Sequence, residues 1–249
     1  MKKILIIGIG AGDPDFVTMQ AVKALNTVDV FFILEKGAAK DGMMELRREI
    51  CRRHAKDRAY RIVESPSPPR DPRPADYAAC VDDLNRAKQG AFERMIADGL
   101  GEGQTGAILA WGDPSLYDST IRNVEAIAAC QGIEYEVIPG ITAVQALAAR
   151  HRITLNTIGR PVEITTGRRL AEGWPAGVDS VVVMLDGEET YRRFTDQDID
   201  IYWGAYLGTP DEILIAGRLA EVADEIHRVR TAQRSAHGWI MDTYLMRRR

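Results

Sequence analysis

The sequence predicts an α/β protein made of two α/β domains. Three observations favour this class: short β-branched runs alternate with amphipathic stretches, glycine-bearing turns follow three of these runs, and strand-like runs dominate after residue 160. The chain of 249 residues is long enough to bury two cores, and its 45% hydrophobic composition is ordinary for a globular protein.

In the first half, buried strands alternate with helices. Residues 4–7 (ILII) are a β-branched run that ends in glycine, which is typical of a buried strand. Apolar residues at helical spacing, such as Met43, Leu46 and Ile50, predict the helices. Five prolines within residues 64–74 predict a loop. The expected order is strand 4–7, helix 16–25, strand 28–34, helix 43–53, helix 77–96 and strand 105–111.

The pattern changes after Asp118. A helix over 119–130 leads to a strand over 133–138, and a further helix opens near Thr142. Strands are then favoured over residues 161–166, 179–185, 199–208, 212–219 and 238–246. We therefore expect an N-terminal α/β domain of residues 1–115 and a mixed C-terminal α/β domain of residues 116–249.

Charge and cysteine usage argue against several classes of protein. The net charge of −4 gives no reason to expect a nucleic acid partner. No apolar stretch approaches the roughly 18 residues of a membrane span. Cys51, Cys80 and Cys130 are scattered, so neither a metal site nor a disulfide framework is expected. Buried thiols in a reducing compartment are the simplest interpretation, which favours a cytoplasmic protein.

Glycines 8, 10 and 12 follow the first strand and raise the possibility of dinucleotide binding. That turn requires G-x-G-x-x-G, with an acidic residue about 20 positions further on. Counted from Gly8 or from Gly10, the sixth position is aspartate, and only the acidic half of the pattern is present, as Glu35. An NAD(P)-binding oxidoreductase is therefore the less favoured alternative.

Two later turns share the pattern of the first. LAWGDPSLYDST (109–120) and VIPGITAV (137–144) each lead from a strand through glycine into a helix. In a parallel sheet, all three turns would gather at the carboxyl ends of the strands, where open α/β sheets bind ligands. The sequence therefore predicts a ligand site at this edge.

Taken together, IGIGAGDPDFVT (7–18), LAWGDPSLYDST and IPGITAV (138–144) resemble the tetrapyrrole methylase family. Members of that family transfer a methyl group from S-adenosylmethionine to precursors of cobalamin and sirohaem. The order of the motifs is kept, although Ala11 stands where proline is common. The resemblance implies two α/β domains of the class III methyltransferase type with the active-site cleft between them, S-adenosylhomocysteine as a product, and a homodimer.

Further stretches are similar to one branch of the family. WGDPSLYDST, the proline-rich segment, TTGRRL, VVVMLDG and YWGAYLGTPDEILIAGRL resemble the members that methylate precorrin-5 with loss of an acetyl group as acetate. The implied partner is therefore a small tetrapyrrole, without nucleic acid, membrane or metal.

The resemblance also implies the residues that hold the methyl donor, largely through backbone groups. They are Ala11, Trp111, Gly112, Asp113, Thr142, Ala143, Met184 and Leu207. A shift of the match by one residue would replace Leu207 with Tyr206.

Loss of acetate requires water at the acetyl carbonyl, which a general base assists. Asp118 and Asp186 are the candidate bases, and Tyr117 and Tyr206 are candidate hydrogen-bond donors. A structural alternative stays open for both aspartates, because Asp118 could cap a helix and Asp186 precedes glycine in a turn-like pair.

The carboxylates of a tetrapyrrole call for arginine partners. The candidates are Arg70, Arg73, Arg168 and Arg169. Other functions remain open: another methyltransferase of the family, including one acting on ribosomal RNA, or a module that binds S-adenosylmethionine without turnover.

Overall fold

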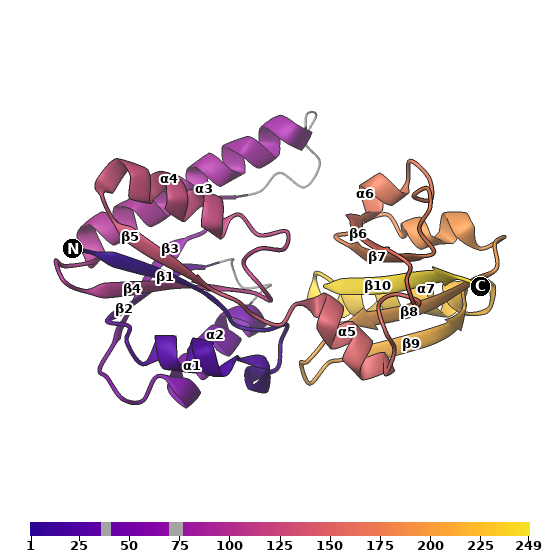
Figure 1. The fold of residues 1–249 in the computed structure, drawn as a ribbon, viewed down its shortest axis with the longest axis horizontal. Helices are drawn as coiled ribbons and strands as arrows, with labels where there is room; N and C mark the ends of the chain where they lie inside the picture. The colour runs from indigo at the N-terminus through magenta and orange to yellow at the C-terminus, as the bar shows by residue number, and fades with distance from the viewer. Residues whose placement is uncertain (36–40, 70–76) are drawn as a thin grey trace. The chain divides into compact units, whose positions relative to one another are not determined.

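The computed structural model describes residues 1–35, 41–69 and 77–249, and the chain divides into two compact units (Figure 1). Unit 1 is Met1–Thr142 and unit 2 is Ala143–Arg249. Each unit contains one five-stranded sheet. The two α/β domains predicted from the sequence are therefore confirmed.

The sheet of unit 1 is parallel throughout, with the order β3-β2-β4-β1-β5. Its strands are β1 (Lys3–Gly8), β2 (Val30–Glu35), β3 (Arg61–Pro66), β4 (Thr105–Ala110) and β5 (Glu134–Ile138). Because β1 pairs with β4 on one side and β5 on the other, the three glycine-bearing turns leave from neighbouring strands.

Helices cover both faces of this sheet (Figure 1). Ile4 and Ile6 of β1 pack with α3 (Tyr77–Gly99) and α4 (Thr120–Gln131). Leu5 and Ile7 pack with α1 (Met19–Leu25) and α2 (Asp41–His54) on the other face. Burial on both faces explains why β1 reads as a continuous apolar run rather than an alternating one.

Three sequence predictions for unit 1 need correction. The boundary lies after Thr142 rather than near residue 115, because β5 completes the first sheet and α4 packs against its core. The helix expected over 16–25 is a short 3₁₀ turn, Pro14–Phe16, followed by α1, whose first turn Thr18 caps. The proline-rich stretch begins inside a strand, since Pro66 ends β3 at the sheet edge, where a missing N–H is tolerated.

The sheet of unit 2 is mixed, with the order β6-β7-β10-β8-β9. The pair β6–β7 is parallel and the other pairs are antiparallel. Its strands are β6 (Val162–Thr166), β7 (Ser180–Met184), β8 (Ile199–Ala205), β9 (Ile213–Arg218) and β10 (Asp242–Arg248). The central strand is therefore the last one in the chain.

The helical segments of unit 2 are α5 (Ala143–His151), α6 (Gly167–Leu170), η3 (Thr190–Phe194) and α7 (Leu219–His237). The largest fully buried side chains of the core are aromatic, namely Trp203, Tyr191 and Tyr244. The sequence reading missed α7, which buries Leu219 and Ile226 against this core.

Among the described residues, no helix is both long and apolar enough to span a membrane. The three cysteines are free, and Cys51 is buried. Burial raises the pKa of the Cys51 thiol to about 12. Cys130 is exposed, so the expectation of three buried thiols is wrong for that residue.

Candidate functional site

Three turns meet at the carboxyl ends of β1, β4 and β5, as the sequence predicted. Gly10 and Gly112 exchange backbone hydrogen bonds, with N···O distances of 3.2 and 2.8 Å. A Cβ on Gly140 would overlap the carbonyl oxygen of Gly112 and lie 2.8 Å from the backbone of Gly8. Only glycine allows this approach, so the turns form one continuous backbone surface.

The carboxylate of Asp113 holds the second and third turns together. One of its oxygens accepts a hydrogen bond from the Gly140 N–H at 2.8 Å, and the other accepts from the Ser115 N–H at 2.8 Å and from the Ser115 hydroxyl. Burial alone would raise the pKa of Asp113, but these hydrogen bonds outweigh it and lower the pKa. The side chain of Asp113 is therefore committed to the protein, and a ligand would meet the backbone of the turn.

Most donor-binding residues implied for unit 1 lie on or beside this surface. Ala11 is 1% exposed and follows Gly10 in the first turn. A Cβ on Gly112 would lie 3.7 Å from the Cα of Thr142, which places the second turn against the third. Trp111 is half-buried at the end of β4. Ala143 is the first residue of unit 2 and of α5.

The remaining implied positions lie at one end of the unit 2 sheet. Met184 pairs with Thr243 and Ala205 pairs with Asp242, so β7 and β8 both end beside the start of β10. Leu207 follows β8 by two residues and is 4% exposed, whereas Met184 is half-buried. This end of the sheet therefore presents Met184 more than Leu207.

Three bulky residues at or beside the candidate positions have left-handed backbone. They are Tyr117, Leu185 and Tyr206, with φ of 51°, 55° and 50°. Such residues cost free energy and concentrate at functional sites. Tyr206 is nevertheless held internally, because its hydroxyl donates to the carbonyl oxygen of Trp239 at 2.7 Å.

Asp186 has a structural environment. Its Oδ2 accepts from the Thr190 N–H and the Tyr244 hydroxyl, both at 2.6 Å. Its Oδ1 accepts from the Thr190 hydroxyl at 3.0 Å and the Glu188 N–H at 3.1 Å. Burial and the charge of Asp186 raise the pKa of Tyr244 well above its ordinary value. A base needs an oxygen open to water, so this geometry favours the structural alternative for Asp186.

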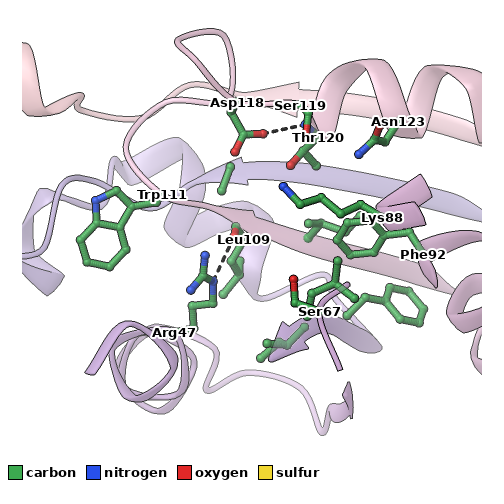
Figure 2. A pocket seen from close by; sticks show the side chains of 15 residues that line it. Arg47, Ser67, Lys88, Phe92, Leu109, Trp111, Asp118, Ser119, Thr120 and Asn123 are labelled. Carbon is green, nitrogen blue, oxygen red and sulfur yellow. Dashed lines mark hydrogen bonds between the residues drawn. The ribbon is translucent and has the colours of Figure 1, made fainter. Parts of the chain in front are cut away.

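Asp118 lies at the edge of a pocket in unit 1 (Figure 2). Its Oδ1 accepts from the N–H of Thr120, the first residue of α4, at 2.6 Å. Arg47, Lys88 and Asn123 line the same pocket. The N–H bond to α4 accounts for the predicted capping role, while the pocket keeps the chemical role open.

Sequence reasoning missed the cations beside Asp118. Arg47 lies between Leu46 and Ile50 of α2, so a charge within an apolar stripe is the signal that could have marked it. It is 9% exposed, and its Nε donates to the carbonyl oxygen of Leu109 at 3.3 Å. Burial lowers the pKa of Arg47, and the negative charge of the nearby Asp118 offsets only part of this decrease. Lys88 lies on the mostly polar part of α3 and carries no comparable signal.

The arginines expected to bind the substrate are placed in part. Arg168 and Arg169 are exposed on the short helix α6, where Arg169 pairs with Glu172 at 2.7 Å. Arg70 and Arg73 lie outside the described residues.

The model of the tetrapyrrole (corrin/porphyrin) methylases matches residues 3–223. This chain therefore belongs to the tetrapyrrole methylase family, as the three turns predicted. It is 53% identical to a deacetylating precorrin-6A synthase from a Sinorhizobium species, over 100% of this chain and 96% of that protein. It is 29% identical to a uroporphyrinogen-III C-methyltransferase from Bacillus subtilis (strain 168), over 82% of this chain and 77% of that protein.

Solved structures agree with this assignment. A cobalamin synthesis related protein (CobF) from Corynebacterium diphtheriae matches with a TM-score of 0.83 and 34% identity, over 99% of this chain and 98% of that chain. A uroporphyrin-III C-methyltransferase from Thermus thermophilus, complexed with S-adenosylhomocysteine, matches with a TM-score of 0.58 over 98% of this chain and 96% of that chain. At 16% identity, that second likeness shows the fold alone.

Proposed function

We propose that this protein is an S-adenosylmethionine-dependent C-methyltransferase that converts precorrin-5 to precorrin-6A in cobalamin biosynthesis and releases acetate. The observation that carries the proposal is the full-length 53% identity to a deacetylating precorrin-6A synthase. The joined turns of unit 1 support it, because they form the kind of surface that a methyl donor requires.

The close packing of the three turns supports a site that holds the methyl donor through backbone groups. At Gly140 the backbone is packed so closely that any Cβ would overlap it, which leaves peptide groups rather than side chains to meet a ligand. In the proposal, the donor is bound by the positions named from the sequence. These are Ala11, Trp111, Gly112, Asp113, Thr142, Ala143, Met184 and Leu207.

Methyl transfer from a sulfonium to an electron-rich ring carbon is an in-line displacement. It requires the two reactants to be held close and aligned with water excluded, and no strong base is obligatory. The rigid turn surface serves this purpose, since Asp113 ties two of its turns together. The protein's contribution to this step is therefore mainly orientation.

Deacetylation needs a base as well. Between the two candidate aspartates, we assign the base to Asp118, because it lies on a pocket while Asp186 accepts four hydrogen bonds inside unit 2. Tyr117, exposed at 46%, is the neighbouring hydrogen-bond donor.

A single-turnover reaction tests the proposal. Purified protein is mixed with precorrin-5 and S-adenosylmethionine labelled in the methyl group, and mass spectrometry of the macrocycle runs beside an acetate assay. We expect one labelled methyl group and one acetate per turnover. Methylation without acetate would indicate another precorrin methyltransferase of the family, and neither product from folded, donor-bound protein would refute a tetrapyrrole substrate.

The proposal includes a cytoplasmic homodimer, because the resemblance to the family implies a dimer and all three cysteines are free. Light scattering after gel filtration should give twice the chain mass of 27.6 kDa. A monomer at micromolar concentration would contradict it.

A further inference from the structure

A small pocket lies at the carboxyl ends of β2, β3 and β4 in unit 1 (Figure 2). Its volume is about 90 Å³. An apolar cavity of about 150 Å³ holds one benzene molecule, so this pocket suits a group of about four heavy atoms. It is too small to enclose a whole tetrapyrrole or a nucleoside.

The walls of the pocket are polar and cationic on one side. The guanidinium of Arg47 comes from α2 and the ammonium of Lys88 comes from α3. Hydroxyls of Ser119 and Thr120 lie at the start of α4, where the helix dipole also favours a negative charge. These groups together suit a small anion or a polarised carbonyl.

The side-chain amide of Asn123 is a hydrogen-bond donor without an acceptor among the described residues. Asn123 lines the pocket and is 4% exposed, and its Nδ2 has no hydrogen-bond partner among the residues that the structure describes. A buried amide donor left unsatisfied is unfavourable, so an acceptor is expected to meet it. An oxygen atom of a small ligand in the pocket would do so.

We infer that this pocket receives the acetyl group of the substrate and retains it as acetate between Arg47 and Lys88. The inference rests on the proposed function, because an acetyl group leaves only in that reaction. Acetate has four heavy atoms and two acceptor oxygens, which matches the pocket in size. Its negative charge suits walls on which two cations, Arg47 and Lys88, outnumber the one carboxylate, that of Asp118. The proximity of Trp111 links the pocket to the turn that carries Gly112 and Asp113.

The step balances with water as the only co-reactant beyond the methyl donor. The water oxygen forms a bond to the acetyl carbon, and the bond from that carbon to the macrocycle breaks. The electron pair of the broken bond stays on the macrocycle and accepts the methyl group, while the sulfonium becomes a thioether. One proton of the water passes to Asp118, and the second leaves as acetic acid ionises beside the two cations.

A carboxylate arm of the macrocycle has the same chemistry as acetate. If the pocket binds such an arm instead of the acetyl group, it acts on substrate affinity rather than on acetate release. Variants of the pocket can separate these two ligands. Lys88→Gln removes one cation without removing polarity. Arg86→Gln, on the same helix, is the matched control because Arg86 lies outside the pocket and pairs with Asp83.

The first measurement is binding of [¹³C]acetate by NMR to the full-length protein saturated with S-adenosylhomocysteine. We expect saturable binding, about tenfold weaker in Lys88→Gln and unchanged in Arg86→Gln. Pivalate carries the same charge on a larger body and should not compete. Acetate binding that is insensitive to Lys88→Gln, or equal competition by pivalate, would overturn the inference.

The second measurement is the single turnover with precorrin-5. For an acetyl pocket, Lys88→Gln slows acetate release at saturating precorrin-5 and leaves the KM near that of the unaltered protein. A raised KM with one acetate still formed per methyl group at the normal rate would assign the pocket to a carboxylate arm and refute the acetyl site. If the unaltered protein releases no acetate at all, the proposed function fails, whatever the NMR result.

Discussion

Replacing Asp186 with asparagine separates a structural role from a catalytic one. In Asp186→Asn, an NH₂ group replaces one carboxylate oxygen. This NH₂ group then faces N–H and O–H groups that donate hydrogen bonds to the carboxylate in the unaltered protein. If the amide takes the place of Oδ2, it confronts the Thr190 N–H and the Tyr244 hydroxyl, each of which is 2.6 Å away. Asp186 is 6% exposed, so water cannot replace these bonds.

The expected loss of stability follows from the two bonds. A hydrogen bond to a charged group contributes about 1.5–3 kcal/mol, so the two together contribute about 3–6 kcal/mol. With a shift in Tm of about 2–4 °C per kcal/mol for a chain of this size, a loss of 3 kcal/mol lowers the Tm by about 6–12 °C. Urea unfolding followed by tryptophan fluorescence, to which the buried Trp203 contributes, measures this loss directly.

Activity decides between the two roles. Single-turnover methylation and acetate release at a temperature where Asp186→Asn stays folded should remain within about twofold of the unaltered protein, because Asp186 touches no reacting atom in the proposed mechanism. A variant of normal stability that loses acetate release by about a hundredfold or more, a loss typical of removing a general base, would refute the structural assignment and return Asp186 to the catalytic step.

Three other predictions follow from the geometry. Gly140→Ala should weaken S-adenosylhomocysteine binding by about tenfold or more in calorimetry, because its Cβ would overlap backbone atoms of the other turns. Thiol reagents at pH 8 should label the exposed Cys130 and spare Cys51, whose pKa burial raises to about 12. Unfolding free energy should fall as the pH drops below about 6.5, because burial lowers the pKa of His151 in the folded chain and the unfolded chain then binds the extra proton.

Each of these predictions has a control variant or an outcome that would contradict it. Gly90→Ala should leave donor binding unchanged, because its Cβ would meet only Arg94 at an ordinary 3.5 Å. Labelling of Cys51 in the native protein would contradict its burial. His151→Gln keeps a donor for the carbonyl of Trp203 but does not titrate, so an unaltered pH slope in that variant would show that His151 is not the cause.

Much of the candidate site could be predicted because its signals are local. The three turns contain glycines at positions where a side chain would overlap neighbouring backbone, and an aspartate follows Gly112. These signals lie in consecutive residues, so they can be recognised in the sequence. The alternation of strand and helix likewise placed β1 and β4 correctly. The same reading put the domain boundary too early, because the chain returns with β5 to the edge of the first sheet only after α4.

The pocket beside Asp118 shows where local signals end. Arg47, Lys88 and Asn123 come from three different helices and meet only because α2 covers one face of the parallel sheet while α3 and α4 cover the other. Likewise, the turn-like pair at Asp186 carried no sign that Tyr244, in the last strand, would donate to its carboxylate.

The sequence by itself determined the fold class, the family and the three turns, because periodicity and the steric demands of glycine act over a few neighbouring residues. Only the tertiary structure decided which aspartate is enclosed and which borders a pocket. Burial, charge neighbours and hydrogen-bond partners depend on segments far apart in the chain, such as β10 beside β7 or α3 beside α4. Those long-range contacts, rather than residue type, separate the environments of Asp186 and Asp118.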